Sequence, residues 1–141
     1  MIELYLNTKI MGGSNIDKNN LKEFIVFSKN KTRIGLFVFS GKDKETGSFI
    51  SVVPSLQISG YGSTLEEADE MLNTSVNEYI RELTKLSSKE KHNELIRSGW
   101  RKAPHKNKEF RPYIDADGVL RDFDFEGKIE KRNIEEELVA A

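Results

Sequence analysis

Residues 65–86 carry the strongest pattern in the chain, a single apolar stripe at helical spacing. The apolar side chains recur three or four positions apart, as on one face of an α-helix: Leu65, Ala68, Leu72, Val76, Tyr79, Leu83 and Leu86. Thr64 is placed to cap this helix in a capping box with Glu67, and Ser63 with Glu66 offers the same box one residue earlier. Because the opposite face is charged or polar, the sequence predicts an amphipathic helix that covers a sheet.

The sheet is predicted in the residues just before this helix. Within residues 33–40, Ile34, Leu36 and Val38 share one face of a strand, and two phenylalanines share the other. Apolar side chains on both faces are typical of a central strand that is covered on both sides. A polar turn then leads to a partner strand over residues 49–53, which predicts an antiparallel hairpin followed by a third strand.

The segment before this hairpin is expected to add β structure. Residues 2–10 alternate apolar and polar side chains, as in a short strand. Residues 20–28 contain a continuous apolar run that fits a buried strand, or a short helix capped by Asp17. The length of the run and its β-propensity favour the strand.

The segment after residue 112 is also β-like. A turn over residues 115–118 would pair residues 113–114 with residues 119–120 in a hairpin. Phenylalanines alternate with acidic residues over residues 122–126, as in an edge strand with a charged outer face. Residues 133–141 are expected to form a frayed helix or to lack fixed structure.

A second helix is predicted to begin after Ser87, which forms a capping box with Glu90. Gly99 suits the left-handed position just past its end, near residue 98. Trp100 would follow and close on Leu95. The tryptophan therefore has a structural role available, and the alternative is an exposed contact with a partner.

Charge is distributed unevenly, although the net charge is only −1. Residues 87–112 hold eight lysines and arginines against three acids, whereas residues 115–141 hold nine acids against four bases. In one interpretation both segments are solvated and partly neutralise each other. In the other, the basic segment over residues 89–111 binds nucleic acid, with aromatic rings available for stacking. Its candidate contacts are Arg97, Trp100, Arg101, Lys102, Lys106 and Lys108.

The stretch over residues 33–86 resembles the HicB-like antitoxin domain. In that family a strand reading roughly "VPDLPGC" leads through "GDTLEEAL" into a helix. The matching residues here are Val53, Pro54, Leu56, Gly60 or Gly62, Thr64, Leu65, Glu66, Glu67 and Ala68. Three features differ: Ser55-Leu56-Gln57 replaces the Pro-Gly-Cys of the family, a long N-terminal segment is additional, and the acidic C-terminal segment lacks the usual DNA-binding module.

The resemblance implies a fold and a role. The fold is α+β, a partial ribonuclease-H-like antiparallel sheet packed against one long amphipathic helix. Here it would form a single domain with an N-terminal extension over residues 1–32 and a C-terminal extension over residues 87–141. The role is a protein-binding module that masks a small basic HicA-like toxin, often as a homodimer. The alternatives are nucleic-acid binding through the basic segment, or an orphan domain that only associates with itself.

Several classes of function are disfavoured by the sequence. The chain has no cysteine, which excludes disulfides, thiolate metal sites and a cysteine nucleophile. The strands predicted over residues 33–40 and 49–53 carry no carboxylate, whereas two-metal nuclease chemistry needs several. We therefore expect no enzymatic activity, metal or cofactor. No long apolar run or basic-then-apolar leader is present, so a cytoplasmic protein is expected.

Overall fold

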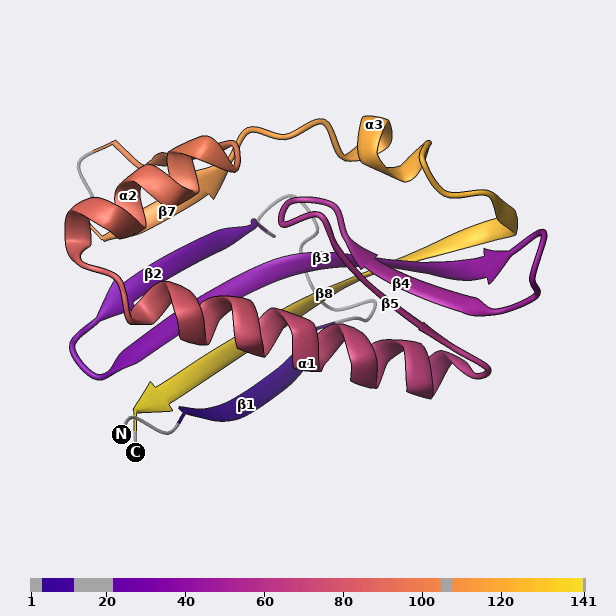
Figure 1. The fold of residues 1–141 in the computed structure, drawn as a ribbon, viewed down its shortest axis with the longest axis horizontal. Helices are drawn as coiled ribbons and strands as arrows, with labels where there is room; N and C mark the ends of the chain where they lie inside the picture. The colour runs from indigo at the N-terminus through magenta and orange to yellow at the C-terminus, as the bar shows by residue number, and fades with distance from the viewer. Residues whose placement is uncertain (1–3, 12–21, 105–107, 141) are drawn as a thin grey trace.

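The long strand β3 (Lys31–Asp43) is the element on which the sheet is assembled. The computed structural model describes residues 4–11, 22–104 and 108–140 (Figure 1). Within these residues the chain is α+β, with an antiparallel sheet in the order β1-β8-β3-β2-β7-β6, in which β4 also pairs with β3 and β5 pairs with β4. The other elements are β1 (Leu4–Met11), β2 (Phe24–Ser28), β4 (Phe49–Val53), β5 (Ile58–Gly62), α1 (Leu65–Thr84), α2 (Ser88–Arg97), β6 (Trp100–Lys102), β7 (Glu109–Pro112), α3 (Ala116–Leu120) and β8 (Phe125–Ala140).

One edge of β3 is shared by two strands that diverge from it. Its first residues pair with β2 and its last residues pair with β4, while β8 runs along the opposite edge. Between the two partners, the Phe37 amide donates to Oε2 of Glu23 at 3.0 Å, and the Ser55 hydroxyl donates to the same oxygen at 2.6 Å. A side chain thus replaces the missing strand, which keeps the buried backbone amide satisfied.

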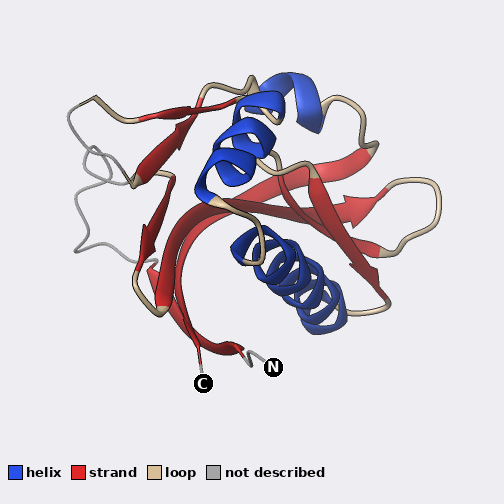
Figure 2. Ribbon diagram, turned by 60° about the vertical axis from the view of Figure 1, so that its left-hand side comes forward, coloured by secondary structure: helices blue, strands red, loops and turns tan. Residues whose placement is uncertain are grey.

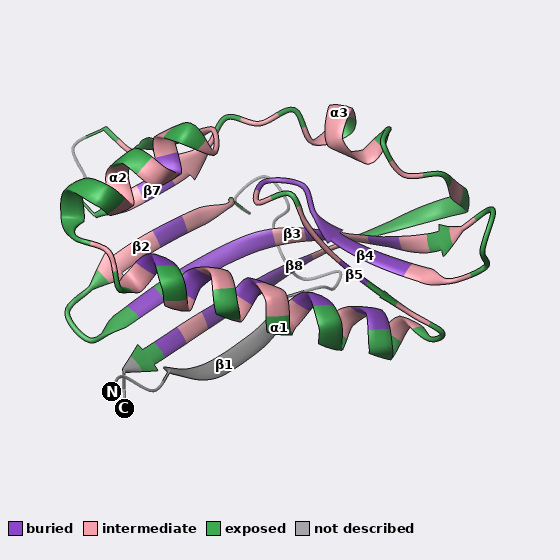
Figure 3. Cartoon of the chain, in the orientation of Figure 1, coloured by how far each residue is buried: buried purple, intermediate pink, exposed green. Residues whose placement is uncertain are grey.

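The core lies between the sheet and α1. Figure 2 shows the sheet curving around this helix, and Figure 3 shows buried residues on the facing sides of both. The predicted apolar face of β3 is fully buried against the stripe of α1: Ile34, Leu36, Val38, Leu72, Val76, Ile80 and Leu83. Each such side chain contributes about 1.5–3 kcal/mol when buried. On the other face of β3, Lys131 Nζ lies 4.2 Å from the Phe37 ring centroid.

The joint between β5 and α1 is tight because it contains glycines. A Cβ atom on Gly60 would lie 2.3 Å from the Ala68 carbonyl oxygen, and one on Gly62 would lie 2.4 Å from Cβ of Glu67. Thr64 caps α1 by accepting the Glu67 amide at 3.1 Å, as predicted. The other half of the predicted capping box is wrong, because the Glu67 carboxylate accepts the Ser63 amide at 2.8 Å.

The second helix follows its prediction closely. Ser87 and Glu90 form both bonds of a capping box at the start of α2, and Gly99 has a positive φ of 95° just past its end. Trp100 is fully buried in the same apolar cluster as Leu95, and its Nε1 donates to the Ser55 carbonyl oxygen at 2.8 Å. The structural role predicted for Trp100 is confirmed.

Three expectations for the extensions have different outcomes. The strand interpretation of residues 20–28 is confirmed over Phe24–Ser28 by β2, whereas residues 20–21 and Asp17 lie outside the described residues. The predicted hairpin around residues 115–118 is wrong, because α3 occupies these residues. The frayed helix or lack of fixed structure expected over residues 133–141 is also wrong for residues 133–140.

These last residues belong to β8, which lies between β1 and β3. Ile134 and Leu138 are buried four residues apart on β8, and Glu136 between them is buried as well. Pairing on both edges of the strand outweighs the charge of the acidic run. The first strand of the chain therefore pairs with the last one, β1 with β8 (Figure 1).

Candidate functional site

The residues that match the HicB-like pattern have structural positions. Pro54 is buried at the turn between β4 and β5, the glycines allow close approach to α1, and Thr64 caps the helix. Leu65 and Glu67 lie in the first turn of α1, and Ala68 is fully buried. Glu66 alone among them is a lining residue of a groove. These residues build the joint of sheet and helix and do not form a catalytic cluster.

The groove along α1 is acidic. It has a volume of about 530 Å³, and its described lining consists of Glu66, Asp69, Glu70, Asn73, Thr74, Asn77, Glu78 and Arg81. Asp69 accepts the Ser51 hydroxyl at 2.5 Å and forms an ion pair with Arg132, so it fixes α1 on the sheet. Glu66, Glu70 and Glu78 follow one line of the helix at spacings of four and eight residues. Their carboxylates form a row along the helix. We call the groove defined by this described lining the acidic groove.

An exposed apolar pair borders the acidic groove. Tyr61 of β5 is 48% exposed and Met71 of α1 is 47% exposed. The two residues are in contact, since the Tyr61 amide lies 3.3 Å from Sδ of Met71. Met71 is a helical neighbour of Thr74, which lines the groove. Aromatic side chains and methionine are enriched in protein interfaces, whose rims are polar.

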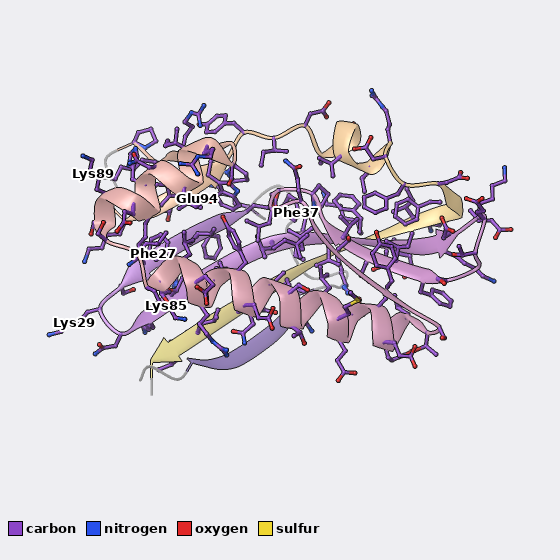
Figure 4. The ribbon with its side chains drawn as sticks, viewed as in Figure 1. Phe27, Lys29, Phe37, Lys85, Lys89 and Glu94 are labelled. Carbon is purple, nitrogen blue, oxygen red and sulfur yellow. The ribbon has the colours of Figure 1, made fainter. Side chains whose placement is uncertain are left out.

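A second site, which is basic, lies beside α2. It is a pocket of about 240 Å³ between the β2–β3 turn, the start of α2 and the β6–β7 pair. Its described lining, which we call the basic pocket, consists of Phe27, Ser28, Lys29, Ser88, Lys91, His92, Lys102, Lys108 and Phe110. Figure 4 shows Phe27 beneath α2 and Lys29 at the adjacent turn, with Lys89 nearby on the helix.

Two phenylalanines form the floor of the basic pocket. Phe27 and Phe110 meet edge to face with centroids 5.9 Å apart. Lys91 Nζ lies 4.9 Å from the Phe27 centroid, and the His92 ring meets Phe110 edge-on at 5.8 Å. Cation–π attraction holds the Lys91 ammonium over the face of Phe27. Phe110 is only 4% exposed, so its ring is not a stacking platform for a base.

The candidate contacts for nucleic acid are divided by the structure. Lys102 and Lys108 line the basic pocket. Arg97 pairs with Glu94 at 3.3 Å, and Arg101 donates to the Ile96 and Trp100 carbonyl oxygens at the end of α2. Trp100 is fully buried, so a stacking role for it is wrong. Lys106 lies outside the described residues.

Lys29 and Phe27 were missed because they come from β2 and its turn, far from the basic segment in sequence. Only the pairing of β2 with β7 brings them beside Lys108. No local sequence signal indicates that pairing.

The acidic C-terminal strand is separated from the basic pocket. In the sheet, β3 and β2 lie between β8 and β7. The acids within residues 87–112 are engaged locally: Glu90 in the capping box, Glu94 with Arg97, and Glu109 with Arg111 at 2.5 Å. The described lining of the pocket itself contains four lysines and no carboxylate.

The described residues contain no group of three or more histidine, aspartate or glutamate side chains arranged to hold a metal ion. Among the same residues, no helix is both long enough and apolar enough to cross a lipid bilayer. Comparisons of the chain with protein-family models, curated proteins and solved structures gave no match.

Proposed function

We propose that the protein is a non-enzymatic, cytoplasmic protein-binding module of the HicB antitoxin type, and that it binds a small basic partner protein. The acidic groove of α1 with its apolar border is the observation that carries this proposal. The order β3, β4, β5 and α1 over residues 31–84 also agrees with the hairpin, third strand and helix that the HicB-like resemblance implies.

The two parts of the surface would contribute differently to binding. Tyr61 and Met71 would become buried in the contact, since aromatic side chains and methionine are enriched in protein interfaces. Glu66, Glu70 and Glu78 would pair with cationic side chains of the partner, which raises the association rate, sets specificity and contributes to affinity. A partner rich in lysine and arginine, as a HicA-like toxin would be, matches this surface.

The test is a pull-down from a lysate of the source cells with the tagged full chain, with half of the lysate treated with nuclease. A variant carrying Glu66→Gln, Glu70→Gln and Glu78→Gln removes three groove carboxylates. Its control carries Glu45→Gln, Asp117→Asn and Glu126→Gln, which are exposed acids on other elements.

We expect wild type and control to capture the same small basic protein in both halves, and the groove variant to lose most of it. Production of that protein alone should arrest growth, and co-production of wild-type chain should restore growth. Equal capture by the groove variant and the control would contradict the assignment of the groove. A captured protein that leaves growth unchanged would contradict the antitoxin role.

A further inference from the structure

We infer that the basic pocket binds the phosphate backbone of a single-stranded nucleic acid. Four lysines line a recess of about 240 Å³, and its described lining contains no carboxylate. Placing like charges together is unfavourable unless an anion compensates them. The pocket is thus a second site, on different elements from the acidic groove, and it does not depend on the function proposed for that groove.

The shape of the pocket favours a flexible strand over a duplex. Reading a duplex requires a helix or a two-stranded ribbon that enters a groove, whereas here the lysines line the walls of a concave recess. A single strand can turn one phosphate into such a recess and lay its neighbours along the flanking cations. Lys89, which is exposed on α2 next to the pocket, extends the positive surface beyond it.

The floor of the pocket argues for recognition of the backbone. Lys91 covers one side of Phe27, and Phe110 is buried against it. The rings therefore position cations and leave little aromatic face for stacking. We expect oligo(dT) and oligo(dA) to bind with affinities within about threefold of each other, because every base carries the same phosphate.

The number of lysines in the lining favours a polyanion over free phosphate as the ligand. A single phosphate carries at most two negative charges near neutral pH, which is fewer than the four ammonium groups around the pocket. Successive phosphates of one strand can satisfy all four. Inorganic phosphate, added at constant ionic strength, should therefore compete only weakly with an oligonucleotide.

The experiment is fluorescence anisotropy of labelled oligo(dT), about 12 nucleotides long to match the usual site size, with the full chain. With four phosphate contacts on a single strand, affinity should fall about 50-fold between about 50 and 200 mM salt. The pocket variant carries Lys29→Gln, Lys102→Gln and Lys108→Gln. The control variant carries Lys42→Gln, Lys44→Gln and Lys128→Gln, exposed residues that are outside the described lining of the pocket.

We expect the pocket variant to lose most of its affinity and to retain only about a threefold salt effect over that range, as one remaining contact predicts. The control should stay within about twofold of wild type. Thermal unfolding checks that both variants fold. If the pocket variant does not fold, Lys29→Gln alone, at an exposed turn, should still flatten the salt slope by about 0.7.

Three results would overturn the inference. The control variant could lose as much affinity as the pocket variant, which would indicate non-specific attraction. A duplex of the same length could bind as tightly as the single strand. Inorganic phosphate could displace the oligonucleotide at constant ionic strength, which would assign the pocket to a small oxyanion. None of these results bears on the groove variant, so failure here and failure of the proposed function are distinguishable.

Discussion

At the scale of single residues, Glu23 is a half-buried carboxylate just before β2 that bonds to β3 and to the β4–β5 turn. Burial raises its pKa above the ordinary 4.5, while hydrogen bonds from Ser55 and Phe37 and the charge of Lys131 oppose the shift. Because the folded pKa is above the unfolded one, ionisation is penalised in the folded state. The penalty is absent below the unfolded pKa and grows as the pH rises through the folded pKa.

Glu23→Gln keeps an acceptor oxygen for both donors and removes that penalty. The free energy of unfolding of the variant, minus that of wild type, should therefore increase as the pH is raised from about 4 to 7. Urea unfolding at several pH values measures this difference. A difference that stays constant over the range would show that Glu23 does not carry the penalty.

Trp100 anchors the end of α2 to the β4–β5 turn. Trp100→Phe removes the Nε1 bond to the Ser55 carbonyl oxygen and leaves unfilled space in a fully buried site. We expect a loss of about 2–4 kcal/mol in the free energy of unfolding. Tyr113→Phe, at a ring that is 72% exposed, should change it by less than about 0.5 kcal/mol. Similar values for the two variants in denaturant titrations would contradict the anchoring role.

At the scale of elements, the contact of β5 with α1 depends on the missing side chain of Gly60. In Gly60→Ala the new Cβ meets backbone atoms of Ala68 and Leu72, so the helix must move away from the strand. We expect a loss of about 3 kcal/mol, at the upper end for overpacking. Gly127→Ala has open space but a φ of +71°, and should cost only about 1–2 kcal/mol. Thermal unfolding that ranks the two in the opposite order would refute the close approach.

The elements that the sequence predicts well are those with local signals. The capping residues Thr64 and Ser87, the apolar periodicity of α1 and the β3–β4 turn can each be recognised from a few neighbouring residues. The ends of the chain have no such signals. The acidic run over residues 135–137 looks solvated when it is read alone, and its place in β8 follows from pairing with β1 and β3. The basic pocket likewise depends on pairing between distant segments, because it forms only where β2 lies beside β7.

At the scale of the whole molecule, β8 lies between the first strand, β1, and the central strand, β3, and pairs with both. Leu138 is fully buried and its neighbour Val139 is 36% exposed. Leu138→Ala should therefore cost about 2–5 kcal/mol in the free energy of unfolding, whereas Val139→Ala should cost less than about 1 kcal/mol. Urea unfolding of the two variants provides the comparison. A negligible cost at Leu138 would mean that the last residues do not belong to the core.

The whole molecule also presents two charged surfaces of opposite sign on different elements. The acidic groove follows α1, and the basic pocket lies between the β2–β3 turn, α2 and the β6–β7 pair. A near-zero net charge therefore results from segregated charges and does not imply a neutral surface. Two ligands of opposite charge could be held at the same time.

The most direct measurement is capture of the basic partner protein by wild type, by the groove variant and by the pocket variant side by side at moderate salt, after nuclease treatment. The account predicts that wild type and the pocket variant capture the same amount of partner, and that the groove variant captures little. Loss of the partner from the pocket variant, with full capture by the groove variant, would contradict the claim that α1 is the protein-binding surface.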